Sequence, residues 1–158
     1  AHSIPAAPPS GWTQQNYTQM NSQGEAVFVP VIAKTSTDSS SGRDYAYADS
    51  KYRNETGNLI DIGLTIADYG AYLIGSAEDP ALFSLNTEDF AYQKTTVGGY
   101  PAWQREPPTT HPTQVTADLE VVINNRFVVR INESSPSGPV EFDQWTSLID
   151  FGEIAALK

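Results

Sequence analysis

The segment ADLEVVINNRFVVRIN, residues 117–132, constrains the fold more than any other part of the chain. Apolar residues occupy every second position on both sides of an asparagine pair: Leu119, Val121 and Ile123 before it, and Phe127, Val129 and Ile131 after it. A period of two is that of a β-strand with one buried face. Since asparagine tolerates positive φ, Asn124-Asn125 predicts a tight two-residue turn in an antiparallel hairpin.

A second alternating run lies earlier in the chain and predicts another half-buried strand. Its apolar positions are Ile60, Ile62, Leu64 and Ile66. The preceding segment DYAYADSKYRN, residues 44–54, alternates less regularly, and NETGN, residues 54–58, predicts the turn that joins the two. Stretches rich in Ser, Thr, Pro and Gly at 35–42, 106–114 and 134–139 predict loops.

Helical signals are few. Asp79-Pro80 is a good helix start, because aspartate caps and proline suits the first helical position; it predicts a short helix through Leu82, Phe83 and Leu85. Near the C-terminus, apolar residues recur at spacings of three and four, which predicts an amphipathic helix: Phe142, Trp145, Leu148 and Ile149. Asp150 is expected to cap a last short turn through Ile154 and Leu157.

We therefore expect an α+β fold, in which an antiparallel β-sheet meander is covered by a few helices, including a C-terminal helix. Residues 1–11 are expected to form a flexible N-terminal lead, and residues 12–158 a single α+β domain.

The order of elements resembles that of uncharacterised exported bacterial proteins with a Pro-rich start, an SGW entry (10–12), a GGYPAW element (98–103), a closing RFVVRI strand (126–131) and a C-terminal helix. More distantly, the chain is similar to the PsbP-like sandwich family. That resemblance implies helices covering an antiparallel sheet, and a non-catalytic accessory or assembly role. It implies no catalytic residue.

Charge and cysteine content exclude several functions. There are 19 acidic and 9 basic residues, so the net charge is −10, which disfavours nucleic acid as a partner. No stretch is long and apolar enough to predict insertion into a membrane. The absence of cysteine removes disulfides, thiolate metal sites and cysteine nucleophiles. The start AHSIPAAPPSGW is typical of a mature N-terminus, which predicts an exported bacterial protein, periplasmic or extracellular.

Two aromatic groups are candidate ligand-binding residues. In TTVGGYPAWQR, residues 95–105, the structural interpretation is an edge strand after a glycine turn, with an aromatic residue on the core. The alternative is a rim on which Tyr100, Trp103 and Arg105 face a ligand. The second group is Tyr45 and Tyr47, which lie near other tyrosines of one hairpin: Tyr52, Tyr69 and Tyr72. They serve either core packing or a platform for a sugar or peptide.

No catalytic residue, metal site or cofactor is predicted. His2 and His111 are both expected in loops, and the chain has no G-x-S-x-G or H-E-x-x-H motif. Asp38, Ser40 and Asp44 loosely match a calcium loop, which fails because Arg43 stands where glycine is required. Within each of the pairs Glu78-Asp79 and Glu88-Asp89 the two adjacent side chains are expected to point apart, so neither pair predicts acid/base catalysis.

The sequence thus favours a non-enzymatic exported accessory or binding domain whose partner is a protein or small ligand of the cell envelope. Two alternatives stay open: a carbohydrate-active or other hydrolytic enzyme that uses scattered carboxylates, and a structural subunit of an envelope assembly.

Overall fold

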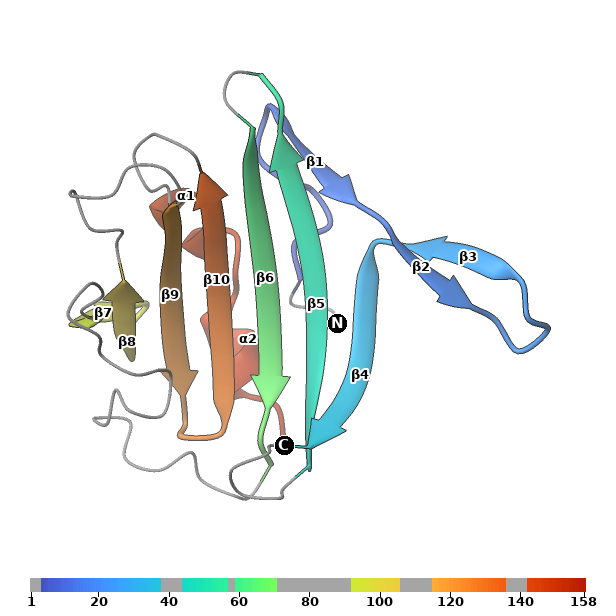
Figure 1. Cartoon of the computed structure of the whole chain (residues 1–158). Coiled ribbons are helices and arrows are strands. Elements are labelled where there is room, and N and C mark those ends of the chain that lie inside the picture. Colours follow the sequence, from blue (N-terminus) through green and yellow to red (C-terminus); the bar gives the residue numbers. More distant parts are fainter. Residues whose placement is uncertain (1–3, 38–43, 57–58, 71–91, 106–114, 136–141) are drawn as a thin grey trace.

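The computed structural model describes residues 4–37, 44–56, 59–70, 92–105, 115–135 and 142–158. This part of the chain is nearly all β-structure, with two short helices near the C-terminus (Figure 1). The strands are β1 (Trp12–Gln15), β2 (Tyr17–Met20), β3 (Ala26–Val29), β4 (Val31–Thr37), β5 (Asp44–Asn54), β6 (Ile60–Asp68), β7 (Tyr92–Val97), β8 (Tyr100–Arg105), β9 (Val115–Ile123) and β10 (Phe127–Ser135). The helices are α1 (Phe142–Thr146) and α2 (Phe151–Ala155).

The main sheet has eight strands in the order β1-β5-β6-β10-β9-β8-β7, with β4 also paired to β5. Every pairing is antiparallel. Two meanders, β4-β5-β6 and β7-β8-β9-β10, meet where β10 lies beside β6. The expected antiparallel meander is therefore confirmed.

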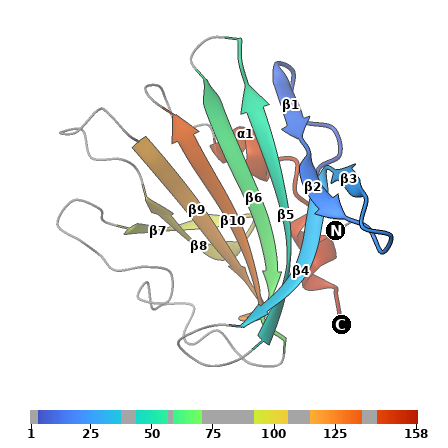
Figure 2. The same cartoon turned by 45° about the vertical axis from the view of Figure 1, so that its right-hand side comes forward.

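The helical cover is smaller than expected. Each helix has five residues, and both lie on the same side of the sheet (Figures 1 and 2). The expectation of an α+β fold covered by helices was wrong in this respect, because the run from Phe142 to Ile149 does not continue as one helix. It ends at Thr146, and Asp150 starts a new helix by accepting a hydrogen bond from the amide of Glu153 at 2.9 Å. The helix expected after Asp79-Pro80 lies outside the described residues.

The core lies between the sheet and the two helices. The alternating residues that the sequence singled out face it, so Leu119, Val121 and Ile123 pack in the same cluster as Phe127, Val129 and Ile131. Trp145 of α1 is fully buried there, with its ring 5.0 Å from that of Trp12 and 4.6 Å from that of Tyr52. These aromatic contacts fix α1 against the sheet.

The predicted strand pairs β5–β6 and β9–β10 are present, although residues 57–58 of the expected NETGN turn lie outside the described part of the chain. Asn124 and Asn125 have φ of 54° and 52°, and the amide of Arg126 donates to the carbonyl of Ile123 at 3.0 Å. Strand pairing starts at Ile123 opposite Phe127, so Arg126 is an extra residue beside the predicted two-residue turn. Gly98 and Gly99 also have positive φ and turn β7 into β8. A Cβ at Gly98 would come within 3.1 Å of the Phe151 ring, which a side chain there would have to displace.

One edge of the sheet carries an inserted arm. β1 and β4 both pair with β5, one after the other, and the β2–β3 hairpin leaves the sheet between them. The arm projects beyond β4 (Figure 1) and exposes Met20 and Phe28, which are 68% and 70% accessible.

Part of the expected N-terminal lead contacts the domain. Ile4 is buried in the core, and the hydroxyl of Tyr52 donates to the carbonyl of Pro5 at 2.7 Å. Residues 1–3 lie outside the described part of the chain.

Candidate ligand-binding site

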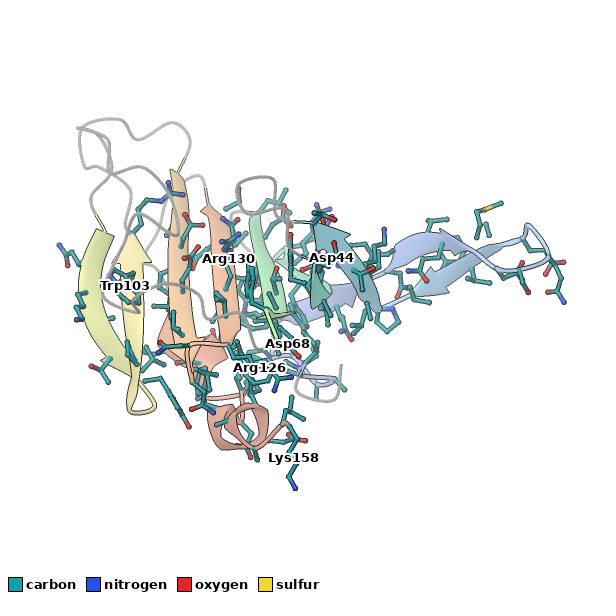
Figure 3. The ribbon with its side chains drawn as sticks, turned by 90° about the horizontal axis from the view of Figure 1, so that it is seen from below. Asp44, Asp68, Trp103, Arg126, Arg130 and Lys158 are labelled. Atoms are coloured by element: carbon teal, nitrogen blue, oxygen red, sulfur yellow. The ribbon has the colours of Figure 1, made fainter. Side chains whose placement is uncertain are left out.

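The sheet face that points away from the helices, here called the outer face, is polar and aromatic. Because side chains alternate along each strand, the residues next to the core positions emerge on this face. Figure 3 looks at the sheet from below and shows α2 and Lys158 on one side, with Arg130 towards the other. The outer face carries the tyrosines of β5 and most of the charged residues of β9 and β10.

Three tyrosines form a cluster at one end of this face. Tyr45 of β5 stacks on Tyr69, which follows β6, with ring centres 4.9 Å apart and planes inclined by 16°. The ring of Tyr47 lies 5.8 Å from that of Tyr45. Both predicted candidates, Tyr45 and Tyr47, are thus brought together with Tyr69. Tyr52 belongs to the core instead, and Tyr72 lies outside the described residues.

A hollow of about 230 Å³ opens beside these rings. Its lining comes from three neighbouring strands: Tyr45, Tyr47 and Asp49 of β5, Thr65, Ala67 and the following Tyr69 from β6, and Val128 and Arg130 of β10. Asp49 Oδ1 is buried and has no hydrogen-bond partner among the described residues. A buried carboxylate oxygen without a donor is costly, which makes Asp49 an unusual member of this lining.

The negative charge of Asp49 also affects Tyr17, at the base of the arm. Burial, and then the negative charge of Asp49, raise the pKa of Tyr17 to about 12. The Tyr17 ring lies 5.0 Å from Nζ of Lys51, the next outward-facing residue of β5. Tyr17 therefore stays a neutral phenol at the edge of the outer face.

A second hollow, of about 370 Å³, lies further along the same strands. Its outward-facing lining residues are Gln15, Lys51, Arg53, Asp61, Gly63, Asn132 and Ser134. Arg53 and Asp61, which are opposite each other on β5 and β6, form an ion pair within this lining, Nε to Oδ1 at 2.8 Å, with both side chains partly exposed.

Strand β9 carries two buried carboxylates near the first hollow. Glu120 is 2% accessible, and its Oε1 accepts from Nε of Arg130 at 2.7 Å. Desolvation raises the pKa of Glu120 to about 7, despite the opposing charges of Arg130 and Arg105. Asp118, two residues earlier on the same face, is also buried and is paired with Arg105 and Asn132. A carboxyl with a pKa near neutrality can act as a general acid, but neither Glu120 nor Asp118 lines either hollow.

The other predicted group does not share one face. Tyr100 packs beside Phe151 on the core side, with ring centres 6.3 Å apart. Trp103 is buried on the outer face with Val122 and Val128, and Arg105 pairs with Asp118 on that face. Tyr100 and Trp103, three residues apart in a strand, therefore point to opposite sides.

The expectation that this segment is an edge strand was wrong. β8 lies between β7 and β9, and its pairing with β9 starts at Ala102. Pro101 is tolerated because its nitrogen, which cannot donate, precedes that ladder.

A third hollow, of about 770 Å³, opens on the helix side. It is lined mainly by short or apolar side chains, among them Ala33, Ala46, Ala48, Ile66, Phe127 and Leu157. Its carboxylate, Asp68, already accepts two hydrogen bonds from Arg126, at 2.8 and 2.9 Å, and one from the amide of Gly70. This hollow is larger; its carboxylate is satisfied within the fold, and Lys34 supplies a second charged group to the lining.

Several other sequence candidates lie outside the described residues: His2, His111, Asp38, Ser40 and the carboxylate pairs at 78–79 and 88–89. Asp44 is described, and accepts from the hydroxyl of Thr37 at 2.6 Å. Within the described ranges, no group of three or more His, Asp or Glu side chains could hold a metal ion. No helix in those ranges has the length and apolar character needed to cross a membrane.

Asp49, Arg130 and Glu120 were missed as site residues from the sequence. The available signal was their alternation with the core positions, which places them on one face. No protein-family model, curated protein or solved structure matches this chain.

Proposed function

We propose that this chain is a non-enzymatic exported binding domain that holds a small polar ligand with one apolar face, such as a single sugar ring, against Tyr45, Tyr47 and Tyr69. The observation that carries the proposal is the hollow itself, in which two tyrosines of β5 and one that follows β6 lie beside a carboxylate whose buried oxygen has no partner among the described residues.

The apolar face of such a ligand matches the tyrosine rings of the hollow, and its polar groups match Asp49 and Arg130. Tyrosine rings give a flat, rigid apolar surface at low entropic cost. Asp49 supplies a carboxylate to the lining. Arg130 is held by Glu120 at 2.7 Å, so its remaining guanidinium donors are already oriented when a ligand arrives.

The size of the hollow favours a small ligand. Pockets for drug-sized molecules measure about 300–1,000 Å³, and this one measures about 230 Å³. Its floor at Ala67 and Thr65 lies below the surrounding side chains, because both of these side chains are short. One ring lying flat on the tyrosines matches this shape better than a long apolar molecule.

Saturation-transfer NMR with a panel of neutral monosaccharides tests the proposal. We expect transfer to at least one of them in the wild type, and its loss in the Tyr45→Ala/Tyr47→Ala double variant. Phe28→Ala removes an exposed aromatic ring from the arm and serves as the control, which should keep the signal. Absence of transfer to every member of the panel would contradict the proposal.

A hydrolytic enzyme is the second candidate, and one observation favours it. The raised pKa of Glu120, about 7, suits a general acid, and Asp118 lies two residues away on the same face of β9. Both carboxylates are almost fully buried, which argues against access by a polymer. Glycosidase assays comparing wild type with Glu120→Gln discriminate: hydrolysis that the variant lacks would favour the enzyme.

A further inference from the structure

The two hollows of the outer face follow the same three strands. Moving two residues along each strand leads from a lining residue of the first hollow to one of the second: from Asp49 to Lys51 on β5, from Thr65 to Gly63 on β6, and from Arg130 to Asn132 on β10. Successive outward-facing residues of a strand are about 6.6 Å apart, twice the rise per residue. The hollows are therefore neighbours on one face.

The smallest side chains of this face lie along its middle strand. β6 presents Ala67, Thr65 and Gly63 between the longer side chains of β5 and β10. On one wall stand Tyr47, Asp49 and Lys51, and on the other Arg130 and Asn132. The two hollows therefore share β6 as their floor, and together they are here called the groove. From Gly63 to Ala67 the floor spans about 13 Å, at roughly 3.3 Å per residue.

The hydrogen-bonding groups of the groove indicate which class of linear polymer it can bind. β6 is paired on both sides, with β5 and with β10, so its backbone groups are used within the sheet. A peptide cannot add to it as a further strand, which is the usual mode for extended peptides on sheets. A ligand in the groove must therefore be recognised by side chains. The first hollow offers the tyrosine cluster, and along the groove follow carboxylate, guanidinium, amide and hydroxyl groups.

We infer that the groove binds a linear oligosaccharide along β6, with one ring on the tyrosine cluster and the following units over Gly63 between Lys51 and Asn132. The inference rests on the proposed function and extends it from a single ring to a chain. The hydroxyl groups of successive units meet Asp49, Arg130, Asn132 and Ser134 in turn.

Gly63 offers a direct way to block the second hollow alone. A Cβ at Gly63 would meet only Cβ of Asn132, at 4.0 Å, which is an ordinary contact. Gly63→Val therefore places its Cβ without a clash and adds two methyl groups over the floor, and valine suits a strand. Ala46→Val is the matched control, because Ala46 lines the hollow on the helix side. Ser134→Trp narrows the second hollow from its exposed wall and replaces Gly63→Val if that variant fails to fold.

The experiment measures binding to immobilised linear neutral oligosaccharides of one to eight units, including glucose, mannose and N-acetylglucosamine series. For the wild type we expect affinity to rise at least tenfold between one and four units. Gly63→Val should lose that rise while keeping single-ring binding, and Ala46→Val should keep both.

The other outcomes separate the two proposals. Single-ring binding with no dependence on chain length, or a rise that survives in Gly63→Val and Ser134→Trp, would overturn the groove and leave the tyrosine site standing. Binding of extended peptides, but of no saccharide, would overturn the ligand class. If no saccharide of any length binds, both the groove and the tyrosine site are contradicted.

Discussion

Gln15 and Val31 lie opposite consecutive residues of β5, Lys51 and Ser50, although residues 16–30 separate them in the chain. β1 and β4 thus form one interrupted edge strand, and the arm is an insertion within it. The side-chain alternation also continues across the gap, since Gln15 lines the outer hollow while Val31 packs towards the core.

Deleting residues 16–30 should therefore join the two strands in register. We expect the deletion variant to fold with a melting temperature within about 5 °C of the wild type, because an isolated two-stranded ribbon adds little stability. Circular dichroism during thermal unfolding measures this. Deleting residues 16–31 is the control: the extra residue moves every β4 side chain to the wrong face and should destabilise strongly. Equal stability of the two deletions would contradict the continuous-strand description.

Glu120 should make the protein less stable as pH rises. The unfolded chain loses this proton near its ordinary pKa of 4.5, whereas the folded chain keeps it to about 7. Between those values the fold binds a proton that the unfolded chain does not. The free energy of unfolding should then fall with rising pH, by at most about 3 kcal/mol, and become level above about 7.

Urea unfolding of the wild type and Glu120→Gln from pH 4 to 8 isolates this effect, because all other groups titrate alike in both proteins. The stability difference between them should change across the window from about 4.5 to about 7. A difference that is constant with pH would show that Glu120 ionises normally in the fold.

Asp68 should have the opposite dependence. The hydrogen bonds from Arg126, together with that from the amide of Gly70, hold the pKa of Asp68 below its ordinary value of 3.8. Its contribution to stability is present above that value and is lost as pH falls through the lower folded pKa. Asp68→Asn should lower the melting temperature at pH 7 by a few degrees and make little difference near pH 2.

Asp61→Asn is the matched control for Asp68. Asp61 pairs with Arg53 at 2.8 Å, but its side chain is 44% exposed, against 34% for Asp68. Water screens the more exposed pair, so its loss should matter less at pH 7. If Asp61→Asn proves the more damaging change, the rigid bidentate contact to Arg126 is not what stabilises this end of the sheet.

The Asn124-Asn125 turn gives a test of backbone conformation. Asn125 has φ of 52°, which an alanine adopts only at a cost of about 1–2 kcal/mol, while glycine adopts it freely. Asn125→Ala should destabilise by about 1 kcal/mol and Asn125→Gly should not. Asn124 is avoided because its amide also donates to the carbonyl of Ala155 at 3.0 Å. Equal losses in both Asn125 variants would mean that the side chain, and not φ, matters.

The local features of the fold could be predicted from the sequence. The alternation around Asn124-Asn125 identified a hairpin and its buried face, and Asp150 was recognised as a helix cap. The extent of the helices was not predicted, because spacings of three and four across 142–149 are satisfied equally by a single turn of helix followed by a bend.

The candidate site depended on the order of the strands, which local patterns do not contain. That Arg130 faces Thr65 on one side and Glu120 on the other follows from β10 lying between β6 and β9. Polar residues that alternate with a core face are expected to be exposed, so the burial of Glu120 gave no sequence signal. The opposite orientations of Tyr100 and Trp103 could be predicted, because side chains alternate between the two faces of a strand and these residues are three positions apart.

The most direct test of the central claim is a map of which backbone amides respond to a linear saccharide. ¹⁵N-labelled protein is titrated with an equimolar mixture of neutral linear hexasaccharides and followed by two-dimensional NMR. The account predicts that shifts concentrate on β5, β6 and β10, from Tyr45 to Arg53 and from Asp61 to Tyr69. Shifts confined to the residues around Ala46, Phe127 and Leu157 on the helix side, or no shifts at all, would contradict it.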